Sequence, residues 1–138
     1  MSVLVASAAR TTSNNSGALV LAHAERLKAA SLLLDVTAAA TLVGDTLDVY
    51  VQTSVDGSTW DDLAHFTQVL GNGGAKKFLA YWQRDLAPTS ALHAPVDASM
   101  AAGVNQGPVG GSLRVKWVVV GTGSFTFSVS GSLTFDLR

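Results

Sequence analysis

The sequence has no cysteine, only three prolines and few charged residues among its 138 positions. Without cysteine, a disulfide framework, a thiolate zinc site, an iron–sulfur cluster and a cysteine nucleophile are all excluded. Charged residues make up 14% of the chain, whereas an ordinary soluble domain has roughly 25%. Nine Lys and Arg against ten Asp and Glu give a formal net charge of -1. We therefore expect no nucleic-acid partner, because neutralising phosphates requires a surplus of basic residues.

A long apolar run is also missing, although the mean hydropathy of +0.32 is high. A membrane-spanning helix needs about 20 mainly apolar residues. The longest stretch without charge, residues 117–135, is interrupted by glycine and serine, and its apolar residues alternate. Residues 1–7 have neither the basic start nor the continuous apolar segment of a signal peptide. The sequence therefore predicts no membrane partner.

What the chain does have is alternation of apolar and polar residues, and a period of two is typical of β-strands. The alternating segments are 32–38, 47–53, 78–83, 113–119 and 125–137. Each has one apolar face, as expected for a strand that covers a core on one side. About seven or eight strands in a chain of this length predict an all-β fold, a single-domain antiparallel β-sandwich.

Two segments lie outside the alternating pattern. Residues 1–17 predict an N-terminal arm and turn, which leaves 18–138 for the sandwich domain. All three prolines fall in a long Pro/Gly/Ala-rich loop, 85–111, and loops of this length commonly bind something or are disordered. Residues 21–31 have helical propensity, but the apolar run before them favours strand with a turn near Glu25.

The best-defined turn is Asp56-Gly57. This pair favours a two-residue type I′ hairpin turn, because glycine readily adopts a positive φ angle. Folding about the pair places Thr53 opposite Trp60, with apolar residues of both strands on one face. The same register turns Asp62 towards the core, so we expect a bulge near Asp61-Asp62.

Other glycines also predict changes of direction. Residues 121–123, Gly-Thr-Gly, predict a short hairpin between the last two strands, and Gly131 predicts a bulge or bend. Residues 71–77 superficially resemble a phosphate-binding loop, but their lysines lack the Walker spacing and lead into a strand. We interpret this segment as a glycine-rich hairpin turn.

No combination of residues matches a catalytic or metal-binding motif. The three histidines are far apart without ligands at metal spacing, so we interpret them as solvated or hydrogen-bonded surface residues. They are His23, His65 and His93. Asp56, Asp61 and Asp62 lack the spacing of a calcium loop, and a turn aspartate beside two solvated acids is a simpler interpretation than a glycosidase pair. We predict no catalytic, cofactor-binding or metal site, and hence no enzyme.

The tryptophans and tyrosines fall on opposite sides of their strands. Trp60, Trp82 and Trp117 lie on the apolar side, which predicts core packing rather than a platform for stacking sugars. Tyr50 and Tyr81 lie on the other side, so we expect them to make surface contacts.

Segments 47–63 and 113–129, together with 31–38, resemble parts of small virion proteins of tailed bacteriophages. These proteins are similar to capsid decoration (cement) proteins or related head and tail accessory subunits, which have β-sandwich folds. Residues 54–60 also resemble the Asp-box turn of sialidase-like propellers, although the segment is one residue shorter here.

The phage resemblance implies a virion protein, assembled in the host bacterial cytoplasm, whose partners are the major capsid protein or other virion subunits. It also implies self-association, with a trimer favoured, and it assigns no individual contact residues. The leading hypothesis is a non-enzymatic capsid decoration protein that binds the outside of the head and stabilises subunit joints. One alternative is a neck or tail accessory structural subunit. Another is a carbohydrate-binding β-sandwich module with exposed aromatic side chains.

Overall fold

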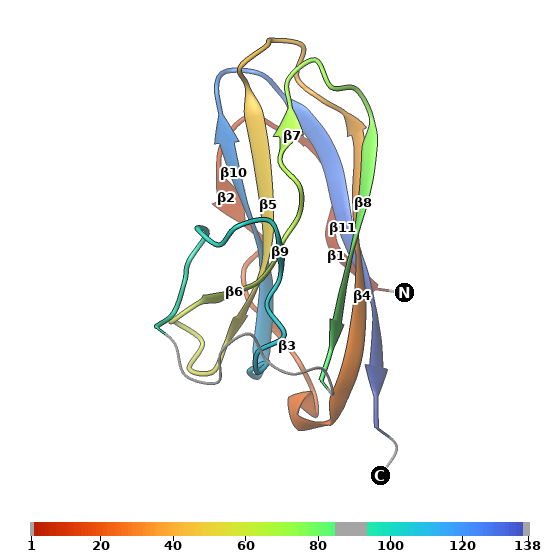
Figure 1. The fold of residues 1–138 in the computed structure, drawn as a ribbon, viewed down its shortest axis with the longest axis vertical. Coiled ribbons are helices and arrows are strands. Elements are labelled where there is room, and N and C mark those ends of the chain that lie inside the picture. Colours follow the sequence, from red (N-terminus) through yellow and green to blue (C-terminus); the bar gives the residue numbers. More distant parts are fainter. Residues whose placement is uncertain (1, 85–93, 137–138) are drawn as a thin grey trace.

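Two antiparallel sheets pack face to face in the computed structural model, which describes residues 2–84 and 94–136 (Figure 1). Sheet A has the strand order β1 (Ser2–Arg10), β11 (Phe125–Phe135), β4 (Leu27–Ala38) and β8 (Lys76–Gln83). Sheet B has the order β2 (Asn14–Asn15), β10 (Ser112–Val120), β5 (Thr46–Ser54), β6 (Asp61–His65) and β9 (Gly103–Val104), with β3 (Leu19–Val20) beside β10 and β7 (Val69–Leu70) beside β5. The only helical turn in the described part is the 3₁₀ helix η1 (Ala24–Arg26). The prediction of an all-β antiparallel sandwich is confirmed.

Alternation along the long strands decides which side chains form the core. Inward-facing residues of β4, β5, β10 and β11 meet between the sheets, where Phe125, Phe127 and Val129 are fully buried. Burying one side chain of this size stabilises the fold by about 1.5–3 kcal/mol. A second, smaller cluster of buried residues lies beside the main core. Its members are Leu27, Ala30, Leu63, Trp82 and Leu113.

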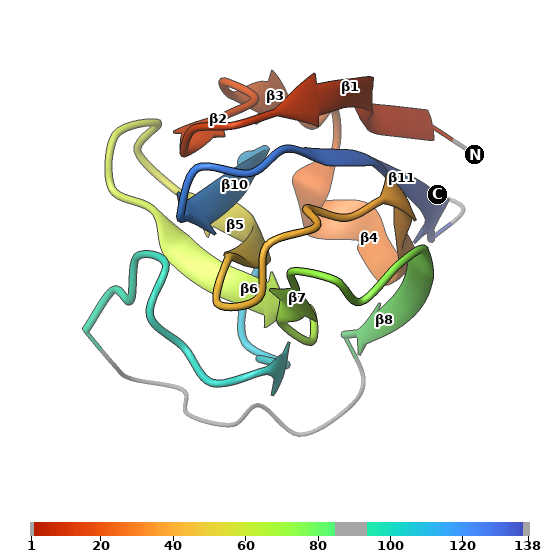
Figure 2. The same cartoon turned by 90° about the horizontal axis from the view of Figure 1, so that it is seen from above.

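Residues 2–10, expected to form part of an arm outside the sandwich, are instead a strand of it. Strand β1 pairs antiparallel with β11 along one edge of sheet A, and Val5 is buried in the core (Figure 2). Two register shifts interrupt this pairing, which explains why the sequence of β1 lacks the regular alternation of the other strands. Residues 11–13 then lead the chain across to β2, and residues 16–18 lead on to β3, at the edge of sheet B.

Two glycine-rich turns were each predicted to join two paired strands of a hairpin. In the structure, each connects one sheet to the other. Residues 71–75 lead from β7 in sheet B to β8 in sheet A, and residues 121–124 lead from β10 in sheet B to β11 in sheet A. Asp45 holds both turns, because its backbone carbonyl accepts from the Gly71 amide at 2.7 Å and its Oδ2 accepts from the Gly123 amide at 2.8 Å. A tight turn between alternating strands has the same local sequence whether the strands pair or face each other across a core. The two hairpin predictions are therefore wrong.

Strands β5 and β6 form the predicted antiparallel pair in a different register. Thr53 pairs with Asp61, one residue further along β6 than predicted, and Gln52 pairs with Asp62. The pairing then skips Leu63, which is a bulge close to the predicted position. The altered register turns Asp62 away from the core and onto the outer face of sheet B.

The loop between β5 and β6, residues 55–60, is longer than the predicted two-residue turn, and its Gly57 has a φ of 82°. No atom lies within 4 Å of a Cβ built on this glycine, so only the backbone conformation would strain a side chain. We expect Gly57→Val to lower the free energy of unfolding by about 1–3 kcal/mol, measured by thermal denaturation. Gly57→Asn is the control, because asparagine tolerates positive φ better than most residues. An unchanged melting temperature for Gly57→Val would contradict the prediction.

The other predicted segments have mixed outcomes. Residues 21–31 contain η1 and the start of β4, which confirms a strand-rich segment with a turn near Glu25. Gly131 pairs with β4 in an unbroken register, so the bulge predicted there is wrong. Of the long loop predicted over 85–111, residues 85–93 lie outside the described residues. The remainder has one short strand, β9, before β10 begins, and it runs past the outer side of β6 (Figure 2).

Candidate functional site

The histidines and acids singled out from the sequence do not converge on one site. His23 is exposed, with its Nδ1 3.6 Å from Oε1 of Glu25. His65 lies in β6, and His93 lies outside the described residues. Within the described part, no three His, Asp or Glu side chains are grouped to hold a metal ion. The same residues include no helix that is both long and apolar enough to cross a membrane.

His65 is largely buried and has a contact at each ring nitrogen. Nδ1 lies 2.8 Å from the Met100 carbonyl oxygen, and Nε2 lies 2.8 Å from Oδ1 of Asp48. Its ring stacks on Tyr50 with 4.1 Å between the centroids. Tyr50 is therefore buried, and the prediction of a surface tyrosine is wrong at this position. Burial raises the pKa of Tyr50, and the charges of Asp48 and Asp62 raise it further.

All three tryptophans are buried. Trp82 and Trp117 belong to the core clusters, which confirms the prediction of core packing for these two, whereas Trp60 belongs to neither cluster. The guanidinium of Arg10 lies 4.8 Å from the ring centroid of Trp117, and that of Arg114 lies 4.4 Å from the ring of Trp60. Trp82 donates from Nε1 to a backbone carbonyl oxygen at 3.1 Å. These tryptophans therefore offer no open ring face on which a sugar could stack.

The acids near the β5–β6 loop have separate structural roles. Asp56 accepts from the backbone amides of Thr59 at 2.6 Å and Ser58 at 2.8 Å, which confirms the turn aspartate. These bonds, with a further one from the Thr59 hydroxyl, hold the pKa of Asp56 well below its usual range. Asp61 and Asp62, interpreted from the sequence as solvated acids, instead bind the long loop that follows β8. That interpretation is therefore wrong for both residues.

Asp62 is the main anchor of this loop and is only 1% exposed. Its Oδ1 accepts from the Gln52 side chain at 2.8 Å and from the Ala98 amide at 2.9 Å. Its Oδ2 accepts from the amides of Ser99 at 2.9 Å and Met100 at 3.0 Å. A carboxylate that accepts four hydrogen bonds is tolerated in a buried position, because both oxygens have partners.

A cluster of polar side chains extends this anchor across the outer face of sheet B. Gln52 donates from Nε2 to Oδ1 of Asp97 at 2.7 Å, and its Oε1 accepts from Nε of Arg114 at 2.7 Å. Nζ of Lys116 lies 2.9 Å from the same Asp97 oxygen. Burial raises the pKa of Asp97, but hydrogen bonds from Gln52 and Lys116 and the charges of Lys116 and Arg114 outweigh it, so the pKa is lowered.

We call the side chains of this cluster the polar latch. Its members are Gln52, Asp62, Asp97, Arg114 and Lys116. The latch holds the long loop over the outer side of β5 and β6, where Tyr50, Gln52 and Asp62 are buried. Among these residues, the sequence pattern indicates only Asp62, as the acid that interrupts the apolar pattern.

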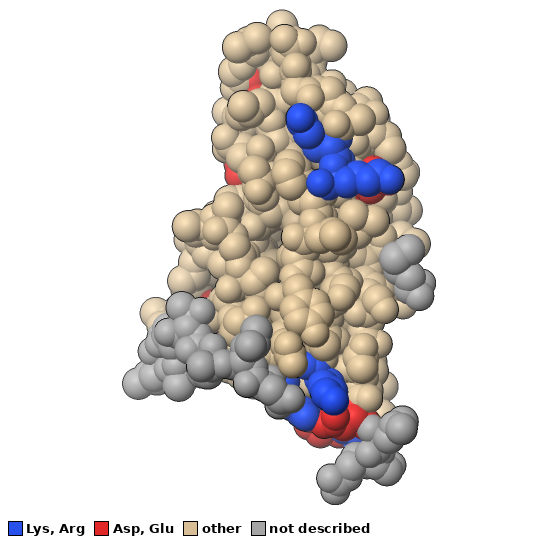
Figure 3. Space-filling view, turned by 45° about the vertical axis from the view of Figure 1, so that its right-hand side comes forward, with Lys and Arg blue, Asp and Glu red and all other residues tan. Residues whose placement is uncertain are grey.

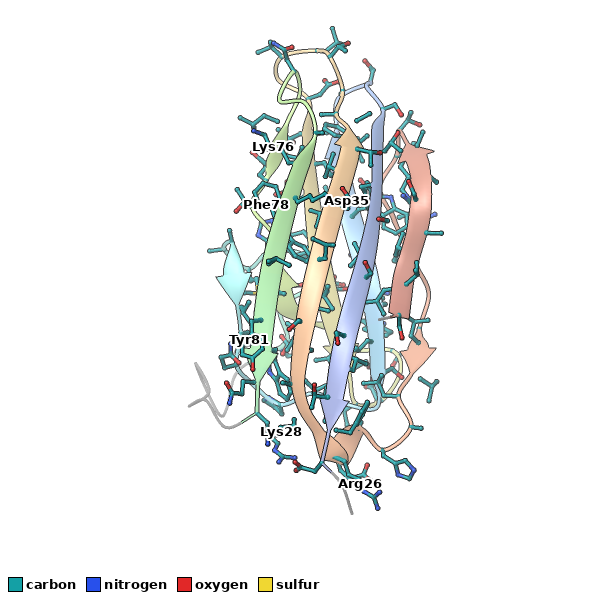
Figure 4. All side chains as sticks on the ribbon, turned by 90° about the vertical axis from the view of Figure 1, so that its right-hand side faces the viewer. Arg26, Lys28, Asp35, Lys76, Phe78 and Tyr81 are labelled. Atoms are coloured by element: carbon teal, nitrogen blue, oxygen red, sulfur yellow. The ribbon has the colours of Figure 1, made fainter. Side chains whose placement is uncertain are left out.

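The outer face of sheet A, in contrast, has no other described segment over it and no charged residue over most of its length. The charge-free segments of its four strands are 2–9, 29–34, 78–83 and 125–135. Charged side chains mark the two ends, with Lys76 and Asp35 towards one end and Arg26 and Lys28 at the other (Figure 4). Figure 3, which looks onto the β8 side of the molecule, shows the same separation, with uncharged surface between two groups of Lys and Arg.

Small hydroxyl residues and exposed apolar residues make up this charge-free face. Val3, Ser130, Leu33 and Leu79 form one row across the four strands. Leu79 is 80% exposed, and Tyr81 on the same strand is half-exposed, which confirms Tyr81 as a surface residue. Serine and threonine supply the outward side chains of β11 between these apolar residues.

A cavity of about 440 Å³ lies beside η1 at the end of the sandwich. Leu27 and Trp82 form part of its apolar wall. The polar groups that line it are engaged with the protein, because Trp82 donates to the Gly107 carbonyl and Arg84 pairs with Asp136. We therefore assign no ligand site to this cavity.

Two features remain as candidates for function: the loop held by the polar latch and the charge-free face of sheet A. Comparisons of the chain with protein-family models, with curated proteins and with solved structures find no match. Function is therefore inferred from the residues and their arrangement in this fold.

Proposed function

We propose that this chain is a non-enzymatic structural protein of a tailed-bacteriophage virion, which decorates the outside of the head and stabilises joints between major capsid protein subunits. The observation that carries this proposal is the charge-free outer face of sheet A, over which no other described segment lies. The likeness of segments 47–63 and 113–129 to small phage virion proteins supports the same role.

The chemistry of the face fits a surface that becomes buried against other subunits. Soluble domains keep charges spread over their surfaces, whereas the centres of protein interfaces are depleted in charged residues. The serine and threonine hydroxyls of β11 can donate and accept hydrogen bonds without the desolvation cost of a charge. The other broad face carries the polar latch and its loop, so the two faces of the sandwich differ in chemistry.

The two alternatives differ in how well the side chains support them. A neck or tail accessory subunit would use the same surface, so only its position on the particle separates it from a decoration protein. A carbohydrate-binding module depends on exposed aromatic rings, and the burial of Trp60, Trp82 and Trp117 removes its main support.

The proposal is tested by adding the purified chain to phage particles that lack it and imaging the particles by electron cryomicroscopy. We expect density for the chain at repeated symmetric positions on the outside of the head, and greater resistance of those heads to heating. Density confined to the neck or tail would support the accessory subunit instead. No density on any part of the particle would overturn the virion role.

A single charge placed in the centre of the face tests which surface binds. Ser31 is exposed in the middle of β4, and we expect Ser31→Glu to weaken binding to heads about tenfold or more, because an unpaired charge would be desolvated there. Val55→Glu is the matched control, since Val55 is 90% exposed in the β5–β6 loop away from sheet A. Titration of heads with each variant measures the effect. Equal losses for both variants would show that another surface binds.

A further inference from the structure

The side chain of His65 lies between two oxygen atoms that accept hydrogen bonds. Nδ1 is 2.8 Å from the carbonyl oxygen of Met100, in the long loop, and Nε2 is 2.8 Å from Oδ1 of Asp48, in β5. A neutral imidazole carries hydrogen on one nitrogen only, so it can donate to one of these oxygens but presents a lone pair to the other. Bonds to both oxygens therefore require the imidazolium form of His65, which carries hydrogen on both nitrogens.

The contacts of Asp48 assign the proton between the two side chains to His65. Oδ2 of Asp48 accepts from Nε2 of Gln68 at 2.9 Å, as expected of an ionised carboxylate. Imidazole is a stronger base than a carboxylate, so a proton shared between the two resides on the ring nitrogen. The side chains of His65 and Asp48 are only 11% and 14% exposed, so water has little access to replace either bond.

The aromatic neighbour of His65 also suits a cation. The ring of Tyr50 stacks on the imidazole with 4.1 Å between the centroids and 16° between the planes, and the face of an aromatic ring attracts a cation. Burial raises the pKa of Tyr50, so this neighbour is uncharged at neutral pH.

The other charged groups on this face of sheet B belong to the polar latch. The loop contributes Asp97 and β6 contributes Asp62, while β10 contributes Arg114 and Lys116, the latter paired with Tyr50 in the sheet. With Asp48, three carboxylates stand against two basic side chains, a balance that favours a protonated His65. The residues of β8 and β9 that line the hollow beside His65 are uncharged. They are Phe78, Leu79, Ala80, Gly103 and Val104.

We propose that His65 is a proton-dependent second anchor of the long loop, which holds Met100 in mildly acid solution and releases it when the ring loses a proton. The neutral ring keeps its hydrogen on Nε2, because a bond to a carboxylate is stronger than one to an uncharged carbonyl. Nδ1 then presents a lone pair to the Met100 carbonyl oxygen, and the two atoms separate. Asp62 still holds the amides of residues 98–100, so the release is confined to the segment that follows, residues 101–104.

Proton binding at His65 also sets how stability depends on pH. The folded chain offers the charged ring two acceptors, and the unfolded chain does not. The bonds of His65 therefore stabilise the fold below the pH range in which histidine titrates, and this contribution is lost as the pH rises through that range.

Nitrogen NMR of the full chain, labelled at histidine, tests the proposal. We expect hydrogen on both ring nitrogens of His65 at about pH 6 and on Nε2 alone at about pH 8.5. Over the same range, the protection of the amides at residues 101–104 against hydrogen exchange should fall about tenfold or more, after correction for the faster exchange of unfolded chains at high pH.

Asp48→Asn is the matched variant. Its side-chain amide can donate to Nε2 of a neutral His65 while its oxygen still accepts from Gln68, so Nδ1 keeps its hydrogen for Met100. We expect the loop of this variant to be equally protected at both pH values. His23→Gln is the control, since His23 is exposed and its loss should leave the pH dependence unchanged.

Three results would each overturn the proposal. They are a neutral His65 ring at about pH 6, equal protection of residues 101–104 at both pH values in the unchanged chain, and the same loss of protection in Asp48→Asn as in the unchanged chain. None of them bears on the virion role, because the proton-dependent anchor does not depend on it.

Discussion

Asp62→Ala is expected to lower the free energy of unfolding by about 3–5 kcal/mol, because it removes the buried acceptor of four hydrogen bonds. The Gln52 side chain would lose one partner, and three consecutive backbone amides of the loop, Ala98 to Met100, would lose theirs. Buried donors without acceptors cost about 1–3 kcal/mol each, although water entering the loosened loop offsets part of this. Chemical denaturation measures the change.

Hydrogen exchange distinguishes a loosening of the loop held by the polar latch from a loss of stability throughout the fold. Hydrogen exchange of the amides at residues 98–100 should accelerate in Asp62→Ala more than exchange in the strands of sheet A. Asp62→Asn is the matched control, since it keeps the volume and one acceptor oxygen and should cost less. A loss below about 1 kcal/mol in Asp62→Ala, with unchanged exchange in the loop, would mean that the latch does not hold the loop.

Gly110→Ala is expected to have the next largest effect, a loss of about 1–3 kcal/mol or more of unfolding free energy. A Cβ on Gly110 would lie 2.2 Å from the carbonyl oxygen of Ser54 and 2.8 Å from the amide nitrogen of Val55. Both are backbone atoms, so a rotamer change cannot relieve the overlap. The Gly110 amide also donates to Oγ1 of Thr53 at 2.8 Å, so a shift of the chain would weaken this bond. Thermal and chemical denaturation measure the loss.

The adjacent glycine provides the control for this substitution. A Cβ on Gly111 would meet no atom within 4 Å, and its φ is not positive. Gly111→Ala should therefore be neutral or stabilise the fold by about 0.4–1 kcal/mol, because alanine restricts the unfolded chain. Similar losses in the two variants would show that the close approach of Gly110 to β5 does not govern the stability of this connection.

Strand positions were predictable from the sequence because each depends on a local pattern. Alternation in 113–119 and 125–133 places the same residues inward in the structure as in the prediction. Phe135, which follows a register shift, is exposed instead of inward. The turn near Glu25 is also where the sequence places it. Strand β1 was missed because its register shifts remove the alternation on which the prediction depends. A period of two in the sequence identifies a strand with regular pairing, but not a strand whose pairing is interrupted by register shifts.

The polar latch was predictable only in part. Asp62 stood out as an acid among apolar residues, but its partners at 98–100 are backbone amides, which have no sequence signature. Gln52 and Arg114 looked like ordinary outward residues of their strands. The role of Gln52 depends on Asp97, 45 positions away in the chain, and that of Arg114 depends on Gln52, 62 positions away.

The sequence by itself determined the fold class, the burial of the tryptophans and the scarcity of charge. These are properties of residue types at short spacing, and the hydrophobic effect acts on them wherever the strands lie. Only the tertiary structure decided that the turns at 71–75 and 121–124 cross between sheets, that a latched loop lies over β5 and β6, and that no other described segment lies over sheet A. Those outcomes depend on contacts between distant segments, since a tight turn or a polar side chain acquires its role from the backbone that packs against it.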